Sequence, residues 1–203
     1  MAGKDPTNSQ PPQPVGRQRV DPEVPSSHTK KYKEPELAND KVRSRYIEAA
    51  EWFNHGDFRR ALPKFSELLR TLDNNTTPFY VSTLVNKATC MMKVGEAREA
   101  RDALSAYRKV MLSNPKFFHQ LGDPAAKVEL QAKVLNALAS AYSDLGDADN
   151  KVTLLQEVVE VYQKGIGPDK MPTFTAEAAV ANAIGVGPRH DAKTQRDMLL
   201  SVM

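Results

Sequence analysis

The sequence predicts an all-α fold in which antiparallel helix pairs stack on one another, preceded by an N-terminal arm that does not fold by itself. Three observations lead to this prediction. Apolar residues recur at helical spacing from about Asp40 onward, a glycine turn returns three times between such segments, and the first 35 residues are polar and rich in proline. A repeated helix pair accounts for the first two observations, because a single pair cannot bury its apolar face alone.

Residues 1–39 are predicted to form a basic arm that is disordered or extended. Seven of the 14 prolines fall in its first 35 residues, among Gln, Ser, Thr and Lys. A segment with so few apolar side chains cannot bury enough surface to offset the entropy lost on ordering. Residues 1–45 carry nine Lys/Arg and six Asp/Glu, which places the whole net charge of +3 in this region. We expect the arm to become ordered only as an extended segment across a partner.

Residues 40–164 are predicted to form a helical-repeat domain of about three helix pairs. Each unit consists of a helix, a turn at Gly56, Gly95 or Gly146, and a second helix. A small residue lies seven positions before each glycine, and a large residue lies three positions after this small residue. The second helices place a small residue five positions after the glycine and a large one nine positions after it. The residues at these four positions are Ala49, Ala88 and Ala139, then Trp52, Met91 and Tyr142, then Ala61 and Ala100, then Phe65, Leu104 and Leu155.

This pattern, over roughly residues 42–163, resembles the tetratricopeptide repeat family, which implies a right-handed superhelix of antiparallel helix pairs. The turn glycines are 39 and 51 residues apart, against a family period of about 34. We therefore expect insertions at Asp73 to Pro78 and around Asn114 to Pro124. Pro63 predicts a kink in the second helix of the first unit. Lys151 stands where the third unit should have alanine, which predicts a final pair that is splayed or oriented differently.

Residues 165–203 are predicted to cap the stack with two helices. The stretch from Gly165 to Pro172 is expected to break the preceding helix. Thr175 to Ile184 then predicts a short Ala-rich helix. Asp191 to Val202 predicts a final amphipathic helix with Met198, Leu199 and Val202 on its apolar side.

Catalytic and metal-binding chemistry is not expected. The four histidines, at positions 28, 55, 119 and 190, have no metal-ligand spacing, and no convergent set of polar residues can be assembled. Cys90 is the single cysteine and lies in an apolar helical pattern, which predicts a buried small hydrophobe rather than a nucleophile. We expect no enzymatic activity, no cofactor and no metal.

The chain is expected to act in the cytoplasm and not at a membrane. No run of 18 or more apolar residues occurs, and the first residues lack the apolar core of a secretory signal. A cytoskeletal or ciliary assembly is one candidate location, because acidic microtubule surfaces attract a basic, proline-rich segment.

The family resemblance implies that the first helix of each unit lines a concave groove. By this analogy we predict a mixed apolar and mildly basic site for a peptide or helix of a partner protein. The family's best-known ligand mode clamps a C-terminal carboxylate, but Tyr46 and Ala50 stand at the first-unit clamp positions, so no such clamp is expected. The predicted groove residues are Arg43, Tyr46, Phe53, Asn54, Val85, Thr89, Met92, Lys93, Lys133, Asn136 and Ser140, with Ala50 and Ser143 beside them.

The predicted function is that of a protein–protein interaction adaptor or scaffold, a small subunit of a larger assembly that binds through the groove and the arm. RNA binding is the alternative, because Lys30, Lys31, Lys33, Arg43 and Arg45 form a basic cluster. The remaining residues carry nineteen charges of each sign, and a neutral repeat body argues against an RNA groove. The oligomeric state, and whether the groove or the arm dominates binding, are left open.

Overall fold

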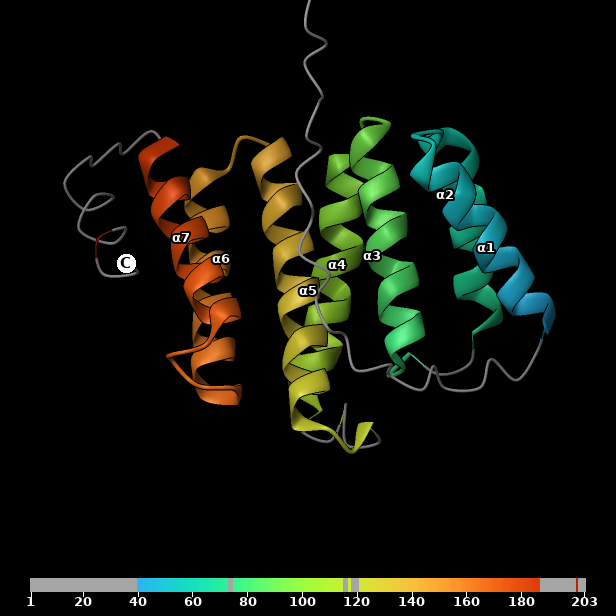
Figure 1. Ribbon diagram of the computed structural model, residues 1–203. Coiled ribbons are helices and arrows are strands. Elements are labelled where there is room, and N and C mark those ends of the chain that lie inside the picture. The colour runs from blue at the N-terminus through green and yellow to red at the C-terminus, as the bar shows by residue number, and fades with distance from the viewer. Residues whose placement is uncertain (1–39, 73–74, 115–116, 118–120, 187–199, 201–203) are drawn as a thin grey trace, which may run out of the picture. The chain divides into compact units, whose positions relative to one another are not determined.

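The computed structural model describes residues 40–72, 75–114, 117, 121–186 and 200 (Figure 1). The chain divides into two units, residues 1–36 and 37–203, and every described residue lies in the second. The arm over residues 1–39 and almost all of the helix predicted from Asp191 to Val202 lie outside the described residues. The helices of the described part are α1 (Asp40–Asn54), α2 (Phe58–Thr71), α3 (Pro78–Lys93), α4 (Ala97–Ser113), α5 (Pro124–Asp144), α6 (Ala148–Gly165) and α7 (Met171–Val186).

The seven described helices form a stack in which each helix packs against the next one in the chain (Figure 1). Helix α3 also packs against α5, so the first helices of the second and third units lie side by side. The pairs are α1 with α2, α3 with α4, and α5 with α6, and α7 follows on α6. The predicted all-α fold of stacked antiparallel helix pairs is confirmed, and the right-handed sense of the superhelix stays a prediction.

The three predicted glycine turns share one backbone geometry. Gly56, Gly95 and Gly146 have φ of 78°, 94° and 74°, in the left-handed region that a residue without Cβ adopts at little cost. The residue after each glycine donates its backbone N–H to a carbonyl five residues back, at 2.9, 2.8 and 2.9 Å. This is the hydrogen bond of a Schellman motif, which ends a helix and satisfies one of its last carbonyls. Each unit therefore reverses direction in the same way.

The small and large positions of the repeat pack as the pattern predicts. Ala49, Ala88 and Ala139 are at most 2% exposed, and Ala61 and Ala100 are fully buried. The large residues of the second helices are also buried, while those of the first helices pack against the core from its edge. Because an alanine occupies little space, it lets two helices approach closely, and the large residue then fills the gap to the neighbouring unit.

The first unit has a small core of its own that extends into the second. Cys90 of α3 is fully buried there together with Ala49, Ala61, Phe65 and Leu68. Burial raises the pKa of the Cys90 thiol to about 11. A thiol that stays protonated and covered is a weak nucleophile, so the prediction of a buried small hydrophobe is confirmed.

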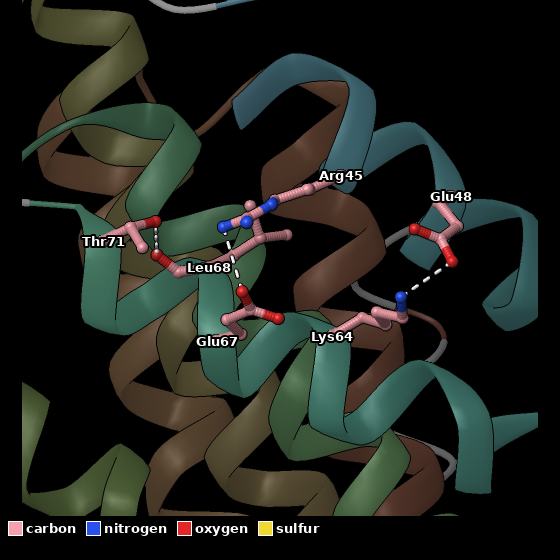
Figure 2. Close-up of polar contacts among 6 residues, drawn as sticks. All are labelled: Arg45, Glu48, Lys64, Glu67, Leu68 and Thr71. Carbon is pink, nitrogen blue, oxygen red and sulfur yellow. Dashed lines mark hydrogen bonds and ion pairs between the residues drawn. The ribbon is translucent and has the colours of Figure 1, made fainter. Parts of the chain in front are cut away.

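Two ion pairs on the outside of the first unit join α1 to α2 (Figure 2). Arg45 lies 3.0 Å from Glu67, and Lys64 lies 2.8 Å from Glu48. These side chains are between 35% and 49% exposed, so water screens the attraction and each pair contributes at most about 1 kcal/mol. The pairs help to set how the two helices align, while the core provides most of the stability.

Tyr107 of α4 anchors both of the predicted insertions. Its hydroxyl donates to the backbone oxygen of Asn75 at 2.7 Å, in the connection before α3. Its ring lies 5.6 Å from that of Phe117, which is 4% exposed in the connection before α5. Asn75 and Phe117, one from each connection, therefore contact the second unit at the same side chain.

One of the predicted irregularities differs from the structure. The final pair is not splayed, because α5 and α6 make the most extensive contact of any two described helices. The Lys151 ammonium group donates to the Ser143 hydroxyl of α5 at 3.2 Å, which gives this polar side chain a partner at the helix contact. Helix α2 runs continuously through Pro63, which lies in its second turn, and a bend of its axis there stays a prediction.

Helix α7 begins earlier than the sequence pattern predicts, at Met171 rather than Thr175. Pro172 was expected to break the helix but lies in its first turn, where the missing backbone N–H has no intrahelical partner to lose. The Thr173 hydroxyl, fully buried, donates to the Gly167 carbonyl at 2.8 Å and ties this turn to the end of α6.

Candidate functional site

An open groove of about 730 Å³ follows α3 and α5 and reaches onto α6. Its floor is apolar, with Val85, Met92, Ala137, Leu155 and Tyr162 buried or half-buried. Its rim carries amide, hydroxyl and charged side chains, most of them exposed. The exposed rim residues are Lys93, Glu129, Lys133, Asn136, Ser140, Ser143 and Asp144, and Thr89 and Lys151 are half-buried.

The uncharged part of the rim offers hydrogen-bonding groups to an incoming chain. The hydroxyls of Thr89 and Ser140 donate to the carbonyls four residues back, at 2.9 and 3.0 Å. Their oxygen lone pairs remain able to accept. The exposed Asn136 amide has no hydrogen-bond partner among the described residues, so it can both donate and accept. These groups match the alternating N–H and C=O groups of a peptide backbone.

Three lysines give the rim its positive charge. The Lys133 ammonium group donates to the Ser82 hydroxyl at 3.0 Å, and the Lys151 ammonium group donates to Ser143. Within the described part of the chain, no carboxylate lies within 4.0 Å of the ammonium group of Lys93, Lys133 or Lys151. Desolvation lowers the pKa of Lys133, because the charged form loses hydration that a neutral hydroxyl replaces only in part.

Two carboxylates lie at the ends of the α5 rim. Glu129 precedes Lys133 by one turn, and Asp144 ends the helix beside Ser143. Burial raises the pKa of Tyr162, and the charge of Glu129 raises it further. The rim therefore carries three lysines and two carboxylates.

Seven of the eleven predicted groove residues lie along this groove, all of them from α3 and α5. The four from α1, namely Arg43, Tyr46, Phe53 and Asn54, do not line it. The Tyr46 ring lies 4.9 Å from Phe79 and 6.0 Å from Phe65, and its hydroxyl accepts a 3.4 Å hydrogen bond from the Asn86 amide. The Phe53 ring lies 5.5 Å from Phe58.

Phe53 packs inside the first unit and Tyr46 packs between α1, α2 and α3, because each ring buries apolar surface there. Arg43 and Asn54 are exposed on the same helix. Whether any of the eleven predicted residues contacts a partner stays a prediction.

Seven lining residues were not predicted to line the groove. Ala137 and Ala139 lie next to Asn136 and Ser140 on α5, and the other five fall into two classes. Glu129 and Asp144 lie four residues from Lys133 and Ser140 on one face of α5, so helical spacing alone could have identified them. Lys151, Leu155 and Tyr162 come from α6, a second helix of its unit. No local pattern indicates that these three face the groove, because that depends on how α6 packs against α5.

The described residues hold no group of three or more His, Cys, Asp or Glu side chains that could bind a metal ion. The expectation of no metal and no cofactor stays a prediction. Among the described helices, none is both long and apolar enough to span a lipid bilayer.

No family model and no curated protein matches this chain. Among solved structures, it is similar to crystal structures of nearly identical TPR-like repeats from a Podosopora anserina protein assigned as a kinesin light chain. One of them, a single-site variant, is 18% identical with a TM-score of 0.38, over 80% of this chain and 92% of that chain. The other is 18% identical with a TM-score of 0.35, over 80% of this chain and 94% of that chain. The chain is thus structurally similar to TPR-like repeat proteins, and its function is inferred below from its own residues.

Proposed function

We propose that this chain is a non-enzymatic adaptor that binds a segment of a partner protein in the groove formed by α3, α5 and α6. The observation that carries the proposal is the groove itself, where an apolar floor lies beneath a rim of exposed amide, hydroxyl and lysine side chains. Solenoids of helix pairs use such extended inner surfaces for binding. A peptide gains affinity by burying apolar side chains on the floor while its backbone bonds to the rim.

The proposal includes the N-terminal arm as a second contact and places the chain in a larger assembly. The arm carries the net positive charge, so an acidic neighbouring subunit would attract it. A cytoplasmic assembly, with cytoskeletal and ciliary complexes as candidates, is the proposed setting. Two contacts on one chain would raise its affinity for an assembly above that of either contact alone.

Affinity capture from native lysate with quantitative mass spectrometry tests the role of the groove. We would compare the full chain with a chain lacking residues 1–39, with Ser140→Tyr, and with Gln156→Tyr. Ser140 is an exposed rim residue, and its replacement by a large ring obstructs the groove. Gln156 is exposed on α6 and does not line the groove, so it provides the matched control. Circular dichroism establishes that all variants retain their helices.

The expected result is that one set of proteins is captured by the full chain and by Gln156→Tyr, and is reduced roughly tenfold by Ser140→Tyr. Capture of the same set by Ser140→Tyr at full yield would show that the groove is not the binding site. Loss of the set only on removal of residues 1–39 would assign binding to the arm instead.

A further inference from the structure

We infer that the groove takes an extended acidic peptide, with two carboxylates about 15 Å apart that pair with Lys133 at one end and with Lys151 and Lys93 at the other. The inference rests on the proposed function and names the chemistry of the partner. The groove residues present three lysines and two carboxylates, and the lysines have no carboxylate partner among the described residues.

The distance between the two basic ends follows from the helices that hold them. The Lys151 ammonium group lies 3.2 Å from the Ser143 hydroxyl, so Ser143 marks its level along α5. Lys133 and Ser143 are ten positions apart on α5, which is about 15 Å at 1.5 Å per residue.

Helix α3 gives the same measure independently. The Lys133 ammonium group lies 3.0 Å from the Ser82 hydroxyl, which marks its level along α3. Ser82 and Lys93 are eleven positions apart, or about 16 Å. The two helices run in the same direction, because Met92 at the end of α3 and Asp144 at the end of α5 line a common hollow. Lys93 and Lys151 therefore lie toward the same end of the groove.

The groups between the basic ends favour an extended peptide over a helix. An extended chain rises about 3.3 Å per residue, so four to five residues span the two ends. Its backbone N–H and C=O groups are free to bond to Asn136, Thr89 and Ser140, whereas a helix uses these groups internally. The side chains between the two carboxylates would then alternate between the apolar floor and solvent.

The rim carboxylate Glu129 restricts the register of the acidic residues at the Lys133 end. Glu129 lies one turn beyond Lys133, whereas Asp144 lies at the level of Lys93, within the other basic end. A peptide carboxylate displaced past Lys133 would face Glu129, and like charges in contact are unfavourable. A wrong spacing is therefore disfavoured by repulsion as well as by the loss of an ion pair.

Selection from a displayed library of random 12-residue peptides on the full chain tests the inference. The selected peptides are then synthesised with amidated C-termini, which excludes recognition of a terminal carboxylate, and their affinity is measured by fluorescence anisotropy. The protein variants are Lys133→Glu, Lys151→Glu and Ser140→Tyr, with Lys109→Glu as the matched control. Lys109 is exposed on α4 and does not line the groove. A 12-nucleotide oligouridine is measured in parallel.

The expected peptides carry two acidic residues four or five positions apart. Each lysine reversal is expected to weaken binding roughly tenfold, and Lys109→Glu to leave it unchanged within about twofold. A peptide with lysine in place of one glutamate should regain affinity for Lys133→Glu. Selected peptides that lose affinity for Ser140→Tyr but carry no paired acidic residues would overturn the inference and leave the proposed function standing.

Two further outcomes have separate meanings. Selection of no peptide that depends on the groove would count against the proposed function itself. If oligouridine binds more tightly than the peptides and its binding is lost with Lys133→Glu, the ligand of the groove is a nucleic acid and not an acidic peptide.

Discussion

The first and third units use the same repeat positions for opposite purposes. Ten positions before the turn glycine the first unit has Tyr46 and the third has Asn136, and three positions before it they have Phe53 and Ser143. The two aromatics pack against the first-unit core, and Tyr46 also contacts α3, whereas Asn136 and Ser143 are exposed along the groove. The backbone frame is the same in both units, because the glycine turn and the buried alanine recur in each.

The contacts between first helices show the same contrast. Tyr46 of α1 reaches Phe79 and Asn86 of α3, so an aromatic side chain closes that junction. Between α3 and α5 the corresponding bridge is the hydrogen bond from Lys133 to Ser82, which leaves the surface polar and open to solvent. The repeat therefore sets where a side chain sits, and its chemistry decides whether the position becomes core or binding surface.

The largest expected effect comes from emptying the first-unit core. Phe65→Ala removes a fully buried ring that packs against Tyr46 and Phe53, and should lower the free energy of unfolding by about 3–5 kcal/mol. Urea unfolding followed by circular dichroism measures this loss. Labelling of Cys90 by a thiol reagent provides a second readout, because Cys90 lies in the same core. Unchanged stability together with unchanged labelling would show that the first unit does not depend on its aromatic core.

Substituting the residue ten positions before the turn glycine in each unit tests the comparison directly. Tyr46→Asn should lower the free energy of unfolding by about 2 kcal/mol, because a half-buried ring and its aromatic contacts are lost. The matched change Asn136→Ala, at the equivalent position of the third unit, should alter it by less than about 0.5 kcal/mol. Equal losses in thermal or urea unfolding would mean that both positions belong to the core.

The junction that brings α6 to the groove can be strained by one methyl group. A Cβ at Gly165 would collide with Cγ2 of Val128, and Val128 is only 6% exposed. Gly165→Ala should therefore destabilise the fold by about 1–2 kcal/mol, as expected for modest overpacking. In the double variant with Val128→Ala the two losses should be less than additive, because the smaller side chain makes room. Strict additivity in urea unfolding would show that the two residues do not meet.

The smallest expected effect concerns the start of α6 and depends on pH. Hydrogen bonds from the Asn150 side chain and backbone hold the pKa of Asp147 below its usual value. A lowered folded-state pKa contributes stability that is present above the unfolded value of about 3.9 and is lost as the pH falls through the folded value. The stability gap between wild type and Asp147→Ala should therefore be wider at pH 7 than at pH 3. Asp147→Asn, which retains the cap without the charge, should lack this pH dependence, and a gap of constant width would contradict the assignment.

Local interactions made much of the fold predictable from the sequence. A glycine in the left-handed region, an aspartate cap such as Asp57, and a buried alanine at a fixed distance from the turn all act within a few residues of one another. Such signals survived insertions of unequal length between units. They failed at Pro172, where the same residue type can end one helix or begin the next, and the buried Thr173 contact decides between the two.

The sequence by itself determined the repeated helix pairs and their turns, and the family resemblance indicated seven residues of α3 and α5 that line the groove. Only the tertiary structure decided that Tyr46 and Phe53 pack against other aromatic rings away from the groove and that Lys151, Leu155 and Tyr162 of α6 complete it. The physical reason is the distance along the chain over which each interaction acts. Turns and caps depend on neighbours along the chain, whereas the exposure of a side chain depends on which distant helix lies against it and how much surface that helix covers.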